Sequence, residues 1–114
     1  MNYYATVFTP PKHILIKFPK ANPIELFITP RTLEQELKFF QGISRGPVHT
    51  VAIFGQILCI CHENGRAAGL QPNFKIGFTQ IYGPAAFVAF RGGEHFSSLN
   101  SKELEYLYTM IKEI

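Results

Sequence analysis

Short apolar runs that stop at proline mark the first third of the chain. The runs are Tyr3 to Phe8, His13 to Phe18 and Ile24 to Ile28, and a proline follows each within two residues. Proline cannot donate to a sheet ladder, so prolines at this spacing delimit short strands and protect their edges. The pattern predicts a meander of two or three strands.

A short helix is predicted after these runs. Leu33, Leu37 and Phe40 recur at i, i+4 and i+7, which places one apolar stripe on a helix. Thr32 and Gln35 match a capping box at its start. Gln41-Gly42 is the predicted end, and residues 43–48 are expected to form a loop.

Two further apolar runs, His49 to Phe54 and Gln56 to Glu63, are separated only by Gly55. A two-residue turn that begins with glycine favours a hairpin at this point. The alternative is one long strand with a kink or bulge at Gly55. Asn64-Gly65 predicts a second hairpin turn, and residues 67–82 are expected to be irregular.

The last part of the chain predicts one strand and one helix. Ala85 to Phe90 is apolar on both faces, which is typical of a central strand. Asn100 and Glu103 match an N-cap and a capping box. The residues predicted to form the core-facing stripe of this helix are Leu104, Leu107, Tyr108 and Ile111.

Together these elements predict a single α+β domain over residues 1–114. We expect a mostly antiparallel sheet of about five or six strands, with two helices packed against it. A chain of 114 residues can enclose one core but not two. Its 11 Phe and 5 Tyr exceed what such a core needs, so most rings are expected inside and some on the surface.

Several short motifs resemble a known family. They are the apolar strand that ends in Glu63-Asn64-Gly65, then Pro72-Asn73, a glycine before the next strand, and Leu99-Asn100 with Glu103 at a helix start. The chain resembles a small family carried by phages, plasmids and bacteria and catalogued as a domain of unknown function. The resemblance covers about half the chain. It implies a fold and a genetic setting, but no chemistry.

Charge and composition narrow the possible chemistry. The net charge is +3 and arises in residues 1–50, where six Lys and Arg face three Glu. Dispersed cations of this kind permit contact with nucleotides or nucleic acid. The chain has no Asp, which excludes Asp-containing triads and Asp-rich calcium loops. The start of the sequence lacks a secretory pattern and no apolar run is long enough to cross a bilayer, so a cytoplasmic location is expected.

The two cysteines are the first candidates for reactive or metal-binding groups. Cys59 and Cys61 share one face of a predicted strand, whereas His62 points to the other face. A structural zinc site needs four ligands, so a metal would have to recruit histidines from elsewhere, and no metal or cofactor is expected. A cysteine nucleophile with His49, His62 or His95 would need an accessible, electropositive setting. We therefore expect both thiols to be buried scaffold, and we predict no catalytic residues.

Aromatic and cationic residues are interleaved between Arg66 and Phe96. Aromatic rings can stack on a base while neighbouring cations hold its phosphates. Asn73 is the motif residue that is closest to the family pattern, and it is alternatively a turn-capping residue. The predicted ligand-binding residues are Arg66, Asn73, Lys75, Phe78, Arg91, His95 and Phe96.

Three functions fit these observations. The first is a non-enzymatic, homo-oligomeric binding protein of a phage or mobile element, which sequesters a nucleotide signal or blocks a host defence protein. The second is nucleic-acid binding through the basic first half, and the third is a small hydrolase or nuclease that uses His62 and Glu63. The cations proposed for the second function are Lys12, Lys17, Lys20, Arg31 and Arg45.

Overall fold

The computed structural model describes residues 11–29 and 32–111. The predicted strand from Tyr3 to Phe8 lies outside these residues. The described elements, in chain order, are β1 (Lys12–Lys17), β2 (Ile24–Ile28), α1 (Leu33–Ser44), β3 (Val48–Phe54), β4 (Ile57–His62), β5 (Pro72–Ile76), β6 (Thr79–Tyr82), β7 (Ala85–Ala89) and α2 (Ser101–Met110). Neither helix is long and apolar enough to cross a membrane.

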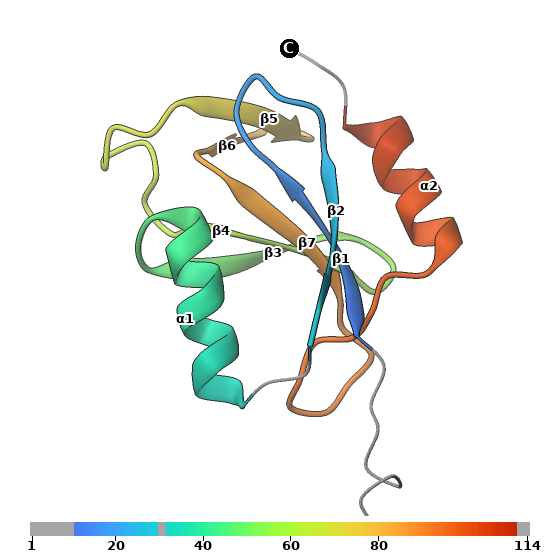
Figure 1. Ribbon diagram of the computed structural model, residues 1–114. Helices are drawn as coiled ribbons and strands as arrows, with labels where there is room; N and C mark the ends of the chain where they lie inside the picture. Colours follow the sequence, from blue (N-terminus) through green and yellow to red (C-terminus); the bar gives the residue numbers. More distant parts are fainter. Residues whose placement is uncertain (1–10, 30–31, 112–114) are drawn as a thin grey trace, which may run out of the picture.

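Five strands form one antiparallel sheet in the order β2-β1-β7-β4-β3 (Figure 1). β7 lies at the centre and pairs with β1 on one side and β4 on the other. This confirms the prediction from its two apolar faces. β5 and β6 form a separate antiparallel hairpin. The domain is therefore α+β, as predicted.

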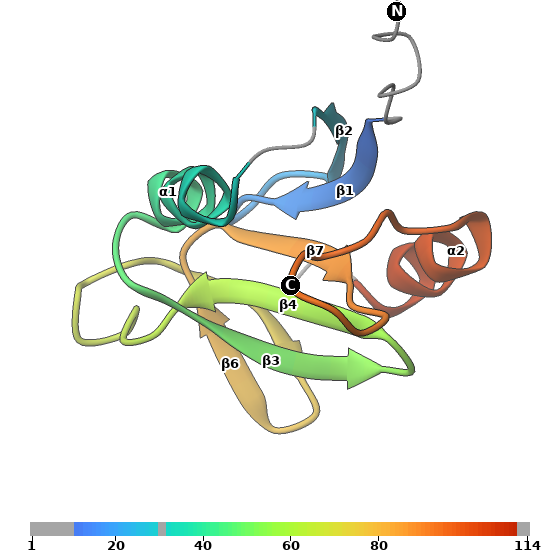
Figure 2. The same cartoon turned by 90° about the horizontal axis from the view of Figure 1, so that it is seen from below.

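The sheet separates two apolar clusters, so the domain has three layers (Figure 2). On one face, Phe40 of α1 packs against Ile14, Ile60 and Val88. On the other face, the β5–β6 hairpin and α2 cover a second cluster. Its main members are Leu15, Cys59, Cys61, Phe74, Ile81, Phe87 and Leu107.

The hairpin predicted at Gly55 is confirmed. Phe54 pairs with Ile57, which leaves Gly55-Gln56 as the two-residue turn, and Gly55 has a positive φ of 58°. A bulge does occur, but it lies earlier in β3, between Ala52 and Phe54. The strand is therefore interrupted near its end, while the chain reversal itself takes place at the glycine.

The second predicted hairpin turn, at Asn64-Gly65, is wrong. Neither residue has the positive φ that a two-residue turn of this kind needs. A β-carbon at Gly65 would lie 2.8 Å from the carbonyl oxygen of Tyr82, so this glycine allows close packing rather than a tight reversal. The hairpin falls instead within residues 67–82, which were expected to be irregular. Its strands are short, and only Phe74 and Ile81 among their side chains are apolar and fully buried.

The apolar stripe predicted for α1 is wrong at Leu33 and Leu37 and right at Phe40. Leu33 and Leu37 are 46% and 48% exposed, whereas Glu36, Phe40 and Ser44 form the buried face. The capping box of Thr32 with Gln35 is confirmed. The helix does not end at Gly42, because it continues for another half turn to Ser44.

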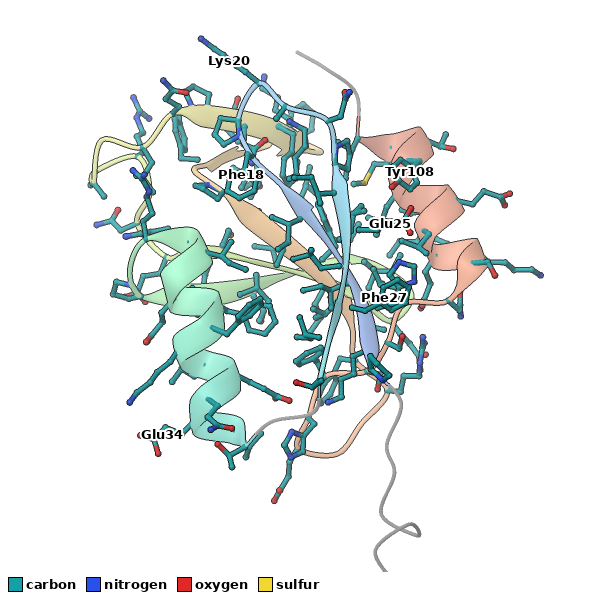
Figure 3. All side chains as sticks on the ribbon, in the orientation of Figure 1. Phe18, Lys20, Glu25, Phe27, Glu34 and Tyr108 are labelled. Atoms are coloured by element: carbon teal, nitrogen blue, oxygen red, sulfur yellow. The ribbon has the colours of Figure 1, made fainter. Side chains whose placement is uncertain are left out.

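Most of the predicted stripe of α2 is confirmed, and Tyr108 is the exception. Leu107 is fully buried and Ile111 nearly so, whereas Tyr108 is 44% exposed. Its hydroxyl donates to the Glu25 carboxylate of β2 at 2.7 Å (Figure 3). Partial burial, and then the neighbouring carboxylate, raise the pKa of Tyr108 to about 12. Tyr108 thus links the helix to the outer strand instead of filling the core.

Candidate binding groove

A groove of about 940 Å³ lies beside α1. It lies between the second half of α1, the β1–β2 turn and the segments around Leu70 and Gly83. Small-molecule sites commonly measure roughly 300–1,000 Å³. Its apolar lining consists of Phe18, Pro19, Phe39, Ile43, Leu70 and Pro84. Phe18 follows β1 and lies toward α1 (Figure 3).

Two cations line the groove, and none of its described lining residues is acidic. The Lys38 ammonium lies 3.5 Å from the Glu34 carboxylate, but both side chains are exposed, so this pair contributes little stability. Within the described residues, the Arg45 guanidinium has no ion-pair partner. Lys38 and Arg45 are therefore able to turn toward a bound anion.

Arg45 has a backbone conformation that favours glycine. It caps the end of α1 with φ 69° and ψ 35°, in the left-handed region. Its N–H and that of Gly46 both donate to the carbonyl oxygen of Gln41. A residue with a β-carbon costs about 1 kcal/mol or more in this region. Arg45 thus supplies a cation to the groove lining at a position where the backbone conformation favours glycine.

Asn73, predicted as a ligand residue, is buried and holds three parts of the fold together. Its amide donates to the carbonyl oxygens of Lys17 at 2.7 Å and Gly83 at 2.8 Å. Its side-chain oxygen accepts from the buried Lys17 ammonium at 3.1 Å. These bonds reach residues far along the chain, rather than the local turn that was the alternative role. Asn73 does not line the groove itself, but its bond to Gly83 helps to position that glycine in the groove wall.

Arg91 forms an ion pair with the first turn of α2. Its guanidinium makes a bidentate pair with Glu103, at 2.7 and 3.0 Å, and donates to the carbonyl oxygen of Ser98 at 2.8 Å. It also contacts the Gln56 side chain. Glu103 accepts in addition from the N–H of Asn100, which confirms the predicted capping box. Arg91 therefore fastens the start of α2.

The Arg91–Glu103 pair predicts a pH dependence of stability. The Arg91 guanidinium, followed by the Asn100 N–H, holds the pKa of Glu103 below its usual value of 4.5, against the opposing effect of partial burial. A depressed folded-state pKa stabilises the protein above the usual value, and this stabilisation is lost as the pH falls through the folded value. Arg91→Gln should cost about 1 kcal/mol at pH 7, and its Tm should approach that of the wild type below pH 4.5. Thermal melts between pH 7 and pH 3 test this, with exposed Lys102→Gln as control, and an equal difference at every pH would contradict it.

His95 and Phe96 contact α1 and β1. The His95 ring lies 3.2 Å from both carboxylate oxygens of Glu36, and the Lys12 ammonium lies 3.3 Å from the same carboxylate. Lys12 also lies 4.4 Å above the centre of the Phe96 ring, which meets Phe40 edge-on. This cluster joins the loop after β7 to α1 and to the face of the sheet that α1 covers.

The other predicted ligand residues lie on separate parts of the surface. Lys75 is exposed on β5, and Phe78 is fully exposed at the tip of the β5–β6 hairpin. Arg66 follows β4 and lines a second, smaller pocket. The predicted set is thus distributed over several elements, and none of its seven members lines the groove.

The basic first half does not form one surface either. Lys17 is buried and Lys12 pairs with Glu36, whereas Lys20 is exposed at the β1–β2 turn (Figure 3). Arg31 lies outside the described residues, and only Arg45 of this set lines the groove.

Histidines and acidic residues are also dispersed. The His62 ring accepts from the N–H of Asn64 at 2.9 Å and lies against Gly46, where a β-carbon would approach to 2.7 Å. Glu63 is exposed in the next turn. In residues 11–29 and 32–111, no three His, Cys, Asp or Glu side chains gather as a metal site.

The groove was missed because its lining comes from segments that are far apart in the sequence. One local signal did exist: Phe39, Phe40 and Ile43 have the spacing of a single helix face, different from the one that carries Leu33 and Leu37. Arg45-Gly46-Pro47 just after that helix was a second signal, because a cation there stands at a helix end.

Comparison with known proteins gives a family and no activity. Residues 16–112 match the family described as a domain of unknown function (DUF3846). No curated protein and no solved structure matches the chain. The match confirms the resemblance to a family of unknown function, while the phage or plasmid setting stays a prediction.

Proposed function

We propose that the chain, which belongs to the DUF3846 family of unknown function, is a non-enzymatic binding protein for a small, nucleotide-like anion. The family supplies no activity, so the proposal rests on the groove. The observation that carries the proposal is an apolar groove with two cations and no acidic residue among its described lining residues. An aromatic and aliphatic lining suits the flat face of a base, and cations at one end suit phosphates.

The groove offers a place for each part of such a ligand. Phe18, just after β1, and Phe39 of α1 supply rings, and the Gln71 amide can both donate to and accept from the edge of a base. Lys38 and Arg45 lie one and a half to two turns apart along and beyond α1, so they can contact phosphates from the same side. In this proposal, the phosphates bind near the end of α1 and the base binds toward the β1–β2 turn.

The biological role we assign follows from the setting that the family resemblance implies. A phage or mobile-element protein of this size, present in the host cytoplasm, would act by sequestering a nucleotide signal. Blocking a host defence protein is the alternative role for the same exposed surface. Neither role requires turnover, and both allow a homo-oligomer.

Native mass spectrometry with a panel of cyclic and linear nucleotides tests the proposal. We expect the wild type to retain at least one nucleotide, and Arg45→Gly to weaken its binding by about tenfold or more through the loss of a charge-assisted contact. Because glycine relieves the left-handed residue, the same variant should be at least as stable as the wild type. Lys75→Gln, an exposed cation outside the groove, is the matched control.

Two outcomes would overturn the proposal. One is that the wild type retains no nucleotide of the panel. The other is that Arg45→Gly and Lys75→Gln weaken binding equally, because the groove cations would then have no special part. The same spectra report the number of subunits and any cleaved nucleotide.

A further inference from the structure

A second, smaller pocket of about 210 Å³ opens over β3 and β4, on the sheet face that the β5–β6 hairpin covers. Cys61 forms part of its wall, together with His49 of β3 and the β6 residues Gln80 and Tyr82. Cys61 is only 2% exposed, so reagents reach its sulfur through this pocket. Cys59 is fully buried and does not line it.

The pocket brings a thiol and an imidazole together. His49 lies directly opposite Cys61 in the β3–β4 ladder, and residues directly opposite each other in an antiparallel pair share a face. The two side chains line the same pocket, and Cys59 lies two residues earlier on the same face of β4. Both cysteines are free thiols.

These contacts make the two thiols unequal. The neighbouring Cys59 thiol is the largest influence and lowers the pKa of Cys61 to about 7, with help from His49 and against the opposing effect of burial. The Cys61 thiol, followed by burial, raises the pKa of Cys59 well above its usual value. The other titratable groups that line the pocket are His62, Glu63, Arg66 and Tyr82. The directions of these two shifts favour Cys61 over Cys59 as the nucleophile.

We propose that Cys61, in the pocket that it shares with His49, is a site of oxidation by small hydroperoxides. The thiolate sulfur attacks the terminal peroxide oxygen, and an S–O bond forms as the O–O bond breaks. The sulfur supplies the electron pair, the departing alkoxide or hydroxide takes a proton from water, and Cys61 becomes a sulfenic acid. The peroxide is the oxidant and leaves as an alcohol or water.

Geometry also defines the product. The pocket of about 210 Å³ can admit a peroxide, since a water molecule occupies about 30 Å³. Cys59 and Cys61 are two residues apart on an extended strand, so their α-carbons lie near the upper limit for a disulfide. The oxidised thiol therefore stays a sulfenic acid, rather than condensing with its neighbour.

Intact and peptide mass spectrometry test the site after hydrogen peroxide treatment in the presence of dimedone, which traps sulfenic acids. We expect one adduct per chain, on Cys61, and none for Cys61→Ser. His49→Gln should slow adduct formation at pH 7 by about fivefold, whereas His95→Gln, a histidine on the other face of the sheet, should leave the rate unchanged. The proposal fails if the folded protein gives no adduct, forms a Cys59–Cys61 disulfide, or reacts equally at both cysteines.

A second measurement does not depend on any variant folding. The rate of alkylation of the wild type by iodoacetamide should rise with a midpoint near pH 7. A midpoint above pH 9, as for an ordinary buried thiol, would overturn the proposal.

Discussion

Asn73→Ala is expected to lower the free energy of unfolding by about 3 kcal/mol. The substitution removes three hydrogen bonds at once, two donated to the carbonyl oxygens of Lys17 and Gly83 and one accepted from the Lys17 ammonium. All of these groups are buried, so water cannot replace the amide without entering the core. A buried carbonyl left without its donor costs about 1–3 kcal/mol.

Urea unfolding, followed by circular dichroism, measures this loss. Lys75→Ala on the same strand is the matched control, because Lys75 is exposed and its loss should change stability by less than about 0.5 kcal/mol. If Asn73→Ala were as stable as Lys75→Ala, then Asn73 would have no structural role. A ligand contact from Asn73 would then have to be considered again.

Leu107→Ala is expected to cost about 3 kcal/mol, the usual range for emptying a fully buried leucine site being about 2–5 kcal/mol. Leu107 is the side chain of α2 that enters the apolar cluster beneath the sheet, among Leu15, Phe87 and Leu99. Phe87 can close the cavity only in part, because its strand, β7, is held on both sides.

The neighbouring residue provides the control. Tyr108→Ala removes a larger side chain but an exposed one, so it should cost about 1 kcal/mol, chiefly through the contact with Glu25. Differential scanning calorimetry of the two variants compares them directly. A larger loss for Tyr108→Ala than for Leu107→Ala would mean that the original stripe, with Tyr108 in the core, was right.

The elements that were predicted correctly are those whose signals are local. The Thr32–Gln35 and Asn100–Glu103 capping boxes depend on three-residue spacing, and both are formed. The Gly55 hairpin turn and the two apolar faces of β7 are equally local. The α1 stripe failed because helical spacing shows which residues share a face, but not which face meets the sheet. Glu36 is buried beside Lys12 and His95, so the face that meets the sheet is the one that carries Glu36 and not the one that carries Leu33 and Leu37.

The candidate site was less predictable for the same reason. Arg66, Lys75, Arg91 and His95 are close in sequence, but strands and turns carry them to different elements. The groove instead joins Phe18 and Arg45 to Leu70 and Gly83, across more than sixty residues of chain. Cys61 and His49 were considered as a pair, but the ladder register that makes them neighbours required the structure.

The position of β7 bears on how the chain acquires its fold during synthesis. β1 pairs with β2, and β3 pairs with β4, so each pair is a hairpin of consecutive strands. The two hairpins share no ladder with each other, and β7 joins them by lying between β1 and β4. A nascent chain on the ribosome can thus complete both hairpins early, yet it cannot join them before Ala85–Ala89 has emerged. Until then, the inner edges of both hairpins are open to pairing with other chains.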